Sequence, residues 1–173
     1  MSVSICPVEA SHEVAFLDAV RRSKSLIESW AAPPDSPEAF ARHLEKYGTD
    51  RCYSFLAKAD DDSLIGCINL NEIVRGAFQS AYLGYYAFVP NQGKGLMRAT
   101  LSSVIYLAFT ALDLHRLEAN VQPANSRSLR LVTSLGFRLE GFSVRYLNVG
   151  GEWKDHARYA ITREEWRVDS NSH

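Results

Sequence analysis

The chain has 173 residues, of which 46% are hydrophobic and 23% are charged, as expected for one compact soluble domain with a buried core. Its formal net charge of −1 excludes the bulk positive field of a typical nucleic-acid-binding protein. No apolar run approaches the ~20 residues that a membrane span requires. We therefore expect a single domain over residues 1–173, with no membrane or nucleic-acid partner.

Metal and disulfide chemistry have little support in this sequence. The cysteines Cys6, Cys52 and Cys67 fall outside any CxxC spacing, and the dispersed histidines form no HExxH motif. Neither a zinc site nor a disulfide framework is expected. The first residues carry a proline and acidic side chains where a signal peptide would have an apolar core, so we expect a cytoplasmic protein.

The first part of the chain is predicted to be helical. Apolar residues recur at helical spacing over residues 14–20, and a second short helix is expected around residues 26–30. The proline-rich segment 31–37 is predicted to be a loop inside the domain. Ser36 is predicted to cap a third helix, which should end at Gly48.

The pattern then changes to strands. Three are predicted, over residues 52–59, 64–74 and 81–89, and the last is rich in tyrosine. A polar turn at residues 60–63 joins the first two, and a turn at residues 75–76 joins the second to the third. These short connections predict antiparallel neighbours.

The second half alternates helices and strands. A helix is predicted over about residues 93–112, a strand over 116–122 and a helix over 126–135. Two further strands, over 137–147 and 153–161, flank a Gly-Gly pair, which is a hairpin signal.

The last residues predict one more helix. Thr162 and Glu165 have the spacing of a capping box for a short terminal helix. The order of elements indicates an α+β fold, in which helices pack against the faces of a mixed sheet.

A glycine-rich turn joins the strand at 81–89 to the helix after it. Gly93 and Gly95 let the backbone approach a ligand, and the helix start presents unpaired amide donors with a partial positive charge. Such a turn can bind pyrophosphate without a metal. A Walker loop is excluded by Phe88 and Gly95, and a dinucleotide fingerprint by Arg98. A glycine-rich turn without a ligand is the alternative.

Two motifs resemble those of the GNAT superfamily of N-acetyltransferases. The pattern Q-x-x-G-x-M from Gln92 resembles its coenzyme A-binding motif, and N-x-x-S from Asn125, followed by L-G-F at 135–137, is similar to its next motif. The resemblance runs from about residue 64 to residue 166. Within the superfamily, the chain resembles the ribosomal-protein-alanine N-acetyltransferases (RimJ/RimL-like), a branch that also holds enzymes for other amines. The stretches that carry this narrower resemblance lie at residues 71–76, 82–85, 93–97, 115–116, 139–141 and 155–156.

The resemblance implies a fold and a set of cofactor-binding residues. In that superfamily the sheet splays beside this glycine-rich turn, and the pantetheine arm of acetyl-coenzyme A enters the gap between the two strands. Phe88 and Val89 would offer backbone groups to it, and Asn125 and Arg130 would face the pantetheine and nucleotide end. Capping of its helix is the alternative role for Asn125. The residues expected to bind acetyl-coenzyme A are Phe88, Val89, Gln92, Gly93, Lys94, Gly95, Leu96, Met97, Asn125 and Arg130.

The reaction implied is direct attack of a primary amine on the thioester, without a metal or an acyl-enzyme. It needs a base for the amine, donors for the oxyanion and an acid for the thiolate. We favour Glu118 as the base, directly or through water, with Glu72 as the second candidate and a solvent-facing carboxylate as the alternative. Ser128 fits the family motif as the acid, unless it only bonds to the helix backbone, and the Val89 amide could meet the oxyanion. Val132 stands where many relatives place a tyrosine acid.

The acceptor side is expected to involve Trp30, Glu72 and Tyr85. Trp30 and the loop after it would wall the amine site, although a core tryptophan is equally ordinary, and one of Tyr85 and Tyr86 would face the cleft. The expected acceptor is a protein N-terminus, such as that of a ribosomal protein. The alternatives are a small amine (an antibiotic, a polyamine or an amino acid) and a non-catalytic acyl-coenzyme A-binding module. A second copy of the chain, forming a homodimer, is the remaining candidate partner.

Overall fold

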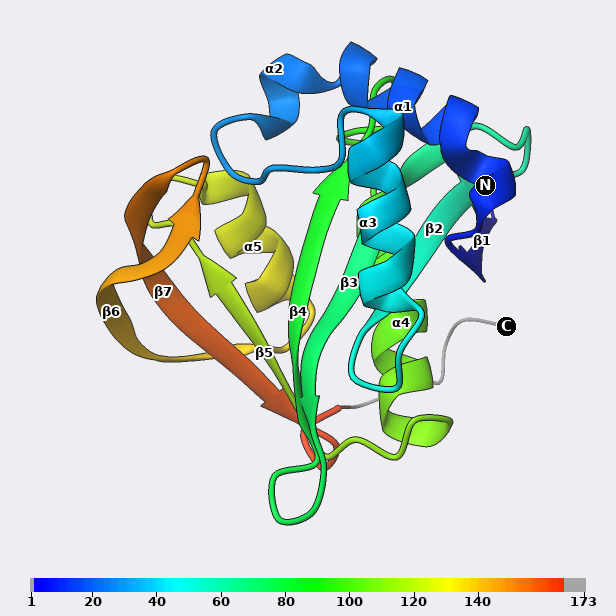
Figure 1. Ribbon diagram of the computed structural model, residues 1–173. Helices are drawn as coiled ribbons and strands as arrows, with labels where there is room; N and C mark the ends of the chain where they lie inside the picture. The colour runs from blue at the N-terminus through cyan, green and yellow to red at the C-terminus, as the bar shows by residue number, and fades with distance from the viewer. Residues whose placement is uncertain (1, 167–173) are drawn as a thin grey trace.

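The strands of the chain form one mixed sheet. The computed structural model describes residues 2–166. The strands are β1 (Val3–Pro7), β2 (Tyr53–Ala59), β3 (Leu64–Val74), β4 (Ser80–Ala87), β5 (Arg116–Val121), β6 (Arg138–Val149) and β7 (Glu152–Thr162). They lie in the order β1-β2-β3-β4-β5-β7-β6, and every neighbouring pair is antiparallel except β4 and β5 (Figure 1). The predicted α+β fold with a mixed, mostly antiparallel sheet is confirmed.

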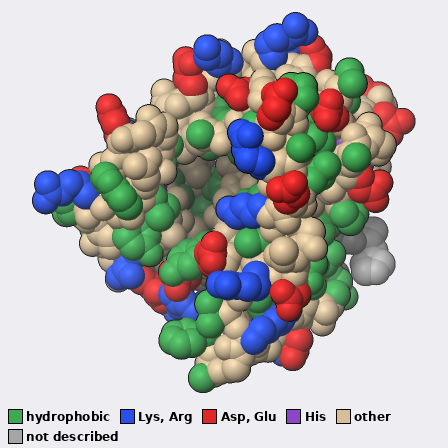
Figure 2. Space-filling model, in the orientation of Figure 1, with side chains coloured by type: hydrophobic (Ala, Val, Ile, Leu, Met, Phe, Trp, Pro, Cys, Tyr) green, Lys and Arg blue, Asp and Glu red, His purple; other side chains and the backbone are tan. Residues whose placement is uncertain are grey.

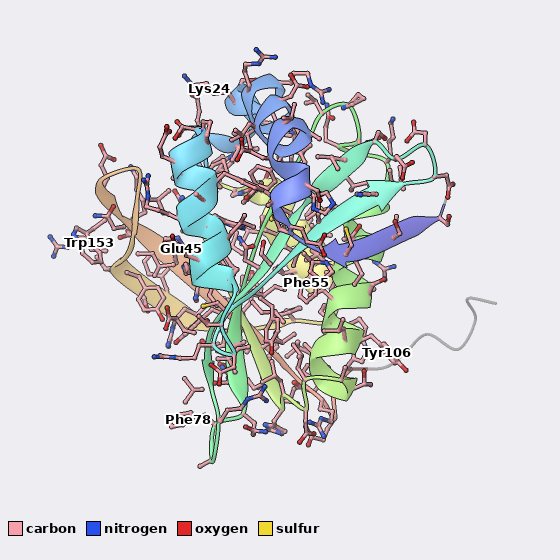
Figure 3. The ribbon with its side chains drawn as sticks, turned by 45° about the vertical axis from the view of Figure 1, so that its right-hand side comes forward. Lys24, Glu45, Phe55, Phe78, Tyr106 and Trp153 are labelled. Atoms are coloured by element: carbon pink, nitrogen blue, oxygen red, sulfur yellow. The ribbon has the colours of Figure 1, made fainter. Side chains whose placement is uncertain are left out.

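Helices cover both faces of this sheet. They are α1 (Glu13–Arg22), α2 (Lys24–Ile27), α3 (Pro37–Tyr47), α4 (Leu96–Thr110) and α5 (Ser126–Ser134), with a 3₁₀ turn at Ala10–His12. Phe16 of α1 and Phe40 of α3 belong to one buried cluster with Leu56 of β2. Leu101 of α4 belongs to the other cluster, with Phe55, the strand residue next to Leu56 (Figure 3). Because successive strand residues point to opposite faces, the two clusters lie on opposite sides of the sheet.

The sheet opens between β4 and β5. These parallel strands pair only at Ser80–Tyr82, although β4 continues to Ala87 and stays paired with β3 up to its end. In Figure 1 the two strands lie together at their lower ends and diverge toward the upper end. The predicted splay of the sheet is therefore present, and its open end lies beside the turn that leads into α4.

The first strand was not predicted from the sequence. Strand β1 is only five residues long and ends in a proline, so its own pattern is too short to be distinctive. It forms because Val3 to Pro7 pair with Ala59 to Phe55 of β2 at the edge of the sheet. Only a partner some 50 residues away therefore defines this element.

Two predicted helix boundaries also differ from the structure. Helix α4 begins at Leu96 and not near Gly93, because Gly93 and Gly95 both have a φ of 77°, outside the helical region. At the other end of the chain, the Glu165 carboxylate accepts from the Thr162 N–H at 2.8 Å, but residues 163–165 form only one turn. Any continuation as a helix lies outside the described residues. No helix within residues 2–166 is long and apolar enough to cross a membrane.

Removing the cap of α3 should lower stability measurably. The Ser36 hydroxyl accepts from the Ala39 N–H at 3.2 Å, with Pro37 in the first turn, as predicted. We expect Ser36→Ala to lower the free energy of unfolding by about 1 kcal/mol and the melting temperature by about 2–4 °C. Calorimetry checks this, with Ser103→Ala as the control, because Ser103 bonds only a carbonyl within α4. Equal effects of the two substitutions would contradict the capping role.

Candidate active site

Two adjoining cavities occupy the open end of the sheet. The larger, which we call the cradle cavity, has a volume of about 550 Å³ and reaches from the diverging end of β4 to the start of α4. The smaller, which we call the small pocket, has a volume of about 240 Å³ and lies deeper between β4 and β5. Both are lined by Trp30, Ala31, Tyr85, Tyr86, Asn125 and Ser128. Figure 2 shows that this face of the molecule is hollowed near its middle.

The turn between β4 and α4 is held in place by a buried asparagine. Asn91 is 6% exposed, and its side-chain amide donates to the Ser63 hydroxyl at 3.0 Å and to the Leu64 carbonyl at 3.1 Å. Beyond it, a Cβ added at Gly93 or Gly95 would meet nothing within 4 Å. The glycines are therefore required by their positive φ, and the space in front of them is open.

This open space faces the start of a 15-residue helix. Within residues 2–166, no hydrogen bond occupies the N–H groups of Gly93, Lys94, Gly95, Leu96 or Met97. Unpaired N–H groups at a helix start attract anions through their aligned dipoles. The turn can therefore hold a diphosphate, and no group of three or more His, Cys, Asp or Glu side chains in the described chain is arranged to hold a metal ion.

Three arginines add positive charge to the same cavity. Arg98 of α4 and Arg127 and Arg130 of α5 all line the cradle cavity. Only Arg130 was predicted as a ligand, while Arg98 was used only to exclude another motif. The signal for Arg98 was its place in the first turn of α4, where its guanidinium donates to the Ser134 carbonyl of α5 at 3.3 Å.

The backbone N–H groups of Phe88 and Val89, which were predicted to be available to a ligand, are both bonded within the protein. The Phe88 N–H donates to the Ile65 carbonyl at 2.8 Å, and its carbonyl accepts from the Asn91 N–H at 3.1 Å. The Val89 N–H donates to the Ser23 hydroxyl at 3.0 Å, so it is not free to meet an oxyanion. The Phe88 N–H is occupied because β4 remains paired with β3 up to its last residue.

The groups that do face the gap can be assigned from backbone alternation. At the start of β4, the Gln79 carbonyl accepts from the His115 N–H on the β5 side at 2.6 Å. At the other end, the Phe88 N–H points to β3. Because successive backbone groups point to opposite edges of a strand, Tyr85 and Ala87 direct theirs into the gap.

Ser128 and Tyr85 form a hydroxyl pair between the two cavities. Their oxygens lie 2.5 Å apart, across the gap from β4 to α5. Burial raises the pKa of Tyr85 to about 12, so its hydroxyl stays protonated at neutral pH and can donate to Ser128. The Ser128 N–H is capped at 3.1 Å by Asn125, so Asn125 takes the capping role considered for it. Val132, at the position where relatives place a tyrosine, is fully buried.

The two predicted carboxylates lie outside both cavities. Glu118 pairs with Tyr82 in the part of β5 that is still bonded to β4, and its carboxylate accepts from Arg116 Nε at 3.0 Å. Glu72, at a bulge of β3, is 57% exposed and lies 3.4 Å from Arg51. Neither side chain lines the small pocket or the cradle cavity, so the predicted role of either as a base in these cavities has no geometric support.

Buried polar side chains that the sequence analysis missed line the small pocket. Asn120 follows Glu118 by two residues on β5, so it points to the same face but nearer the open end. Its Oδ1 atom and the Tyr86 hydroxyl are buried without a hydrogen-bond partner among the described residues. His156 of β7 is 3% exposed and completes this wall. Strand alternation could have identified Asn120 once Glu118 was considered.

The structure brings most of the predicted site residues together. Those that line one or both cavities are Trp30, Tyr85, Gln92, Gly93, Gly95, Met97, Asn125, Ser128 and Arg130. Leu96 is buried at the start of α4, and Lys94 lies with its amine 3.5 Å from the Asn91 side-chain oxygen. Gly93 and Gly95 thus line the cradle cavity, whereas Lys94 does not.

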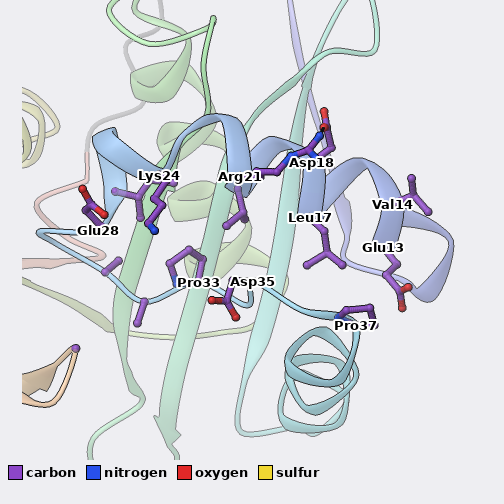
Figure 4. A pocket seen from close by; sticks show the side chains of 15 residues that line it. Glu13, Val14, Leu17, Asp18, Arg21, Lys24, Glu28, Pro33, Asp35 and Pro37 are labelled. Atoms are coloured by element: carbon purple, nitrogen blue, oxygen red, sulfur yellow. Dashed lines mark hydrogen bonds and ion pairs between the residues drawn. The ribbon is translucent and has the colours of Figure 1, made fainter.

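A third cavity adjoins this region. It has a volume of about 810 Å³ and lies between α1, α2 and the loop at 31–37 (Figure 4). Gly150 of the β6–β7 turn also lines it. Ala31 and Ala32 line both this cavity and the small pocket. The third cavity and the small pocket therefore share the loop at residues 31–32 as a common wall.

Comparison with known proteins identifies one family. The model of the acetyltransferase (GNAT) domain matches residues 4–138. A probable N-acetyltransferase, YjcK, from Bacillus subtilis is 40% identical over 120 residues, which cover 69% of this chain and 66% of that protein. The [ribosomal protein uS5]-alanine N-acetyltransferase of Escherichia coli is 40% identical over 114 residues, covering 66% of this chain and 59% of that protein. The chain thus spans less than two thirds of the length of these curated relatives.

A solved structure matches more completely. RimJ of Mycobacterium smegmatis, in complex with a coenzyme A disulfide, superposes with a TM-score of 0.86 at 29% sequence identity. The match covers 94% of this chain and 83% of that chain.

Proposed function

The chain belongs to the GNAT acetyltransferase family, and on that premise we propose that it transfers an acetyl group from acetyl-coenzyme A to a primary amine. One observation carries this proposal. Strand β4 stops pairing with β5 after Tyr82, directly beside a glycine turn whose free N–H groups face a cavity lined by three arginines. A gap in a sheet next to an anion site suits a ligand with a long polar arm and a diphosphate.

In this proposal, acetyl-coenzyme A lies in the cradle cavity with its diphosphate at the start of α4 and its thioester toward the small pocket. Its diphosphate would accept from the N–H groups of residues 93–97, with Arg98, Arg127 and Arg130 near its negative charges. Its pantetheine arm would pair with the backbone groups of Tyr85 and Ala87, as an added strand does. This arrangement leads the thioester toward the small pocket, where the Ser128 and Tyr85 hydroxyls lie.

The proposed chemistry is direct attack of the amine on the thioester carbonyl. The amine nitrogen forms a bond to the carbonyl carbon, the carbon–sulfur bond breaks, and the thiolate leaves. An ammonium acceptor loses two protons over the reaction, and the second of these ends on the sulfur. Ser128 can carry it, because its hydroxyl can give a hydrogen to the sulfur while it receives one from the nitrogen.

The proposed acceptor is the α-amine of a protein N-terminus. The activity named for the 40% identical Escherichia coli relative, which modifies an alanine of a ribosomal protein, supports this choice. The small pocket of about 240 Å³ suits one small first residue, and the adjoining cavity of about 810 Å³ can take the residues that follow. An α-amine, with a pKa near ~8, is also more easily deprotonated than a lysine at ~10.4.

A coenzyme A-release assay tests the acceptor. We expect a free peptide that begins with alanine to react, and the same peptide with a formylated α-amine to be inert even when it contains internal lysines. A peptide that begins with valine should react more slowly by tens-fold at most, because each extra methylene in a pocket changes the free energy by only about 1–3 kcal/mol.

The alternatives predict different outcomes of the same assay. If polyamines, amino acids or aminoglycosides react as fast as the free peptide, the acceptor is a small amine and the N-terminal assignment is wrong. If no amine reacts while calorimetry shows that acetyl-coenzyme A binds, the chain is an acyl-coenzyme A-binding module and the proposed enzyme function fails.

A further inference from the structure

The small pocket contains one side chain with a nitrogen that can take up a proton. Among the described residues that line it there is no aspartate, glutamate, lysine or arginine. The titratable side chains present are Tyr85, Tyr86 and His156. Burial raises the pKa of Tyr85 to about 12 and holds the pKa of Tyr86 well above its usual value, so both phenols already carry their proton at neutral pH. The imidazole of His156 is the remaining group.

The orientation of this imidazole is fixed by its own strand. The Nδ1 atom lies 2.9 Å from the Lys154 carbonyl oxygen, and a carbonyl can only accept. Nδ1 therefore carries the hydrogen, and in the neutral ring Nε2 holds the lone pair. Since His156 is 3% exposed and lines the small pocket, its ring is shielded from bulk solvent and lies beside that pocket.

Among the described residues, no charged side chain forms an ion pair with His156. The Tyr146 ring from β6 meets it edge-on, with ring centroids 6.2 Å apart. On its own strand, Lys154 pairs with Glu152, and the Asp155 carboxylate accepts from the Arg145 N–H at 2.7 Å. Arg158, two residues along β7 on the same face, pairs in the ladder with Asn120 and has its Nε buried without a partner.

Asn120 supplies a second contact in the same pocket. Its Oδ1 atom is buried and has no hydrogen-bond partner among the described residues. A buried acceptor without a donor is unusual, and a bound ligand is one way to complete it. Asn120 and His156 lie on the same face of the neighbouring strands β5 and β7, and an ammonium group has hydrogens for both Oδ1 and Nε2. The lining of the pocket is thus matched to a protonated amine.

Glu118 cannot serve the same position. It pairs with Ala160 of β7, four residues from His156 along the strand. At ~3.3 Å per residue, Glu118 and His156 are therefore separated by about 13 Å along the strand direction. The Glu118 carboxylate is also occupied by Arg116, and it lies at the closed end of the gap.

We infer that Nε2 of His156 takes the first proton from the acceptor ammonium, while Oδ1 of Asn120 accepts a hydrogen bond from the same nitrogen. This inference rests on the proposed acetyl transfer. The ammonium N–H bond breaks and its electron pair stays on nitrogen, which then attacks the thioester carbonyl. The imidazolium releases its proton to solvent, and the second proton of the amine ends on the coenzyme A sulfur.

His156→Gln in the full chain tests this inference. With an alanine-initiated peptide at pH 7, we expect kcat to fall at least tenfold while the Kd of acetyl-coenzyme A changes less than twofold. The wild-type rate should fall toward acidic pH, because a base that already holds a proton cannot take another. In the variant that limb should move toward the pKa of the peptide's own α-amine. His115→Gln is the matched control, because His115 is exposed and bonded to Glu164, and it should leave both profiles unchanged.

Several outcomes would overturn the inference. An unchanged rate and pH profile in His156→Gln does so, as does loss of rate together with loss of acetyl-coenzyme A binding, which marks a structural role. If His156→Gln does not fold, His156→Asn, which keeps a donor for the Lys154 carbonyl, takes its place with the same criteria. Asn120→Leu should raise the KM of the peptide at least fivefold and leave the pH profile in place. A wild-type protein that acetylates no amine would instead refute the proposed function.

Discussion

Gly95→Glu should abolish acetyl-coenzyme A binding, weakening it at least a hundredfold. Gly95 is the N-cap of α4, and its missing side chain leaves open the space in front of the free N–H groups. A glutamate there fills that space, repels the diphosphate, and can itself accept from the helix start. Calorimetric titration with acetyl-coenzyme A measures the loss, and Gly93→Asp should behave in the same way.

A matched substitution separates this effect from backbone strain. Gly76 has a φ of 70° and also has no atom within 4 Å of an added Cβ, but it lies in the β3–β4 turn, at the closed end of the sheet. Gly76→Glu should therefore carry a similar left-handed strain of about 1–2 kcal/mol, with unchanged acetyl-coenzyme A binding. Wild-type affinity in Gly95→Glu, or an equal loss of affinity in Gly76→Glu, would refute the assignment of this turn as the diphosphate-binding site.

Ser128→Ala should lower kcat by about 10²–10⁴-fold if its hydroxyl delivers the proton to the departing sulfur. The Ser128 hydroxyl bonds to Tyr85, whereas the cap of α5 is made by Asn125 to the Ser128 N–H, which alanine retains. The substitution should therefore leave the helix cap intact and shift the melting temperature by only a few degrees. Steady-state kinetics with saturating peptide, together with a thermal melt, measure both quantities.

Two further variants define what this result means. Ser126→Ala, on an exposed residue two positions earlier on the same helix, should change neither rate nor stability. Tyr85→Phe should lower kcat less than Ser128→Ala does, because it removes the donor to Ser128 but keeps the Ser128 hydroxyl. Normal turnover with lowered stability in Ser128→Ala would assign the serine a structural role only.

The parts of the site predicted from the sequence are those that local geometry defines. The turn at 91–97 was recognisable because glycines with positive φ before a helix leave a specific residue pattern. The cap at Ser36 and the Gly150-Gly151 turn, with φ values of 61° and 88°, were recognisable for the same reason. Each depends on residues within a few positions of one another.

The acid–base residues depend on another kind of information. Glu118 and Asn120 lie on the same face of β5, and the sequence does not tell which of them reaches the open end of the gap. The structure decides this, because β4 and β5 separate after Tyr82 and leave Glu118 in the paired region with Arg116. His156 joins the same pocket from the far end of the chain.

The sequence by itself determined the α+β fold, the family resemblance and the anion-binding turn, since these follow from side-chain periodicity and short motifs. Only the tertiary structure decided that β1 pairs with β2, that the Val89 N–H is bonded to Ser23, 66 residues earlier in the chain, and that His156 and Asn120 line the same small pocket. The physical reason is strand register. A shift of one residue turns every side chain of a strand to the opposite face, and register between distant strands is set by packing of the whole core.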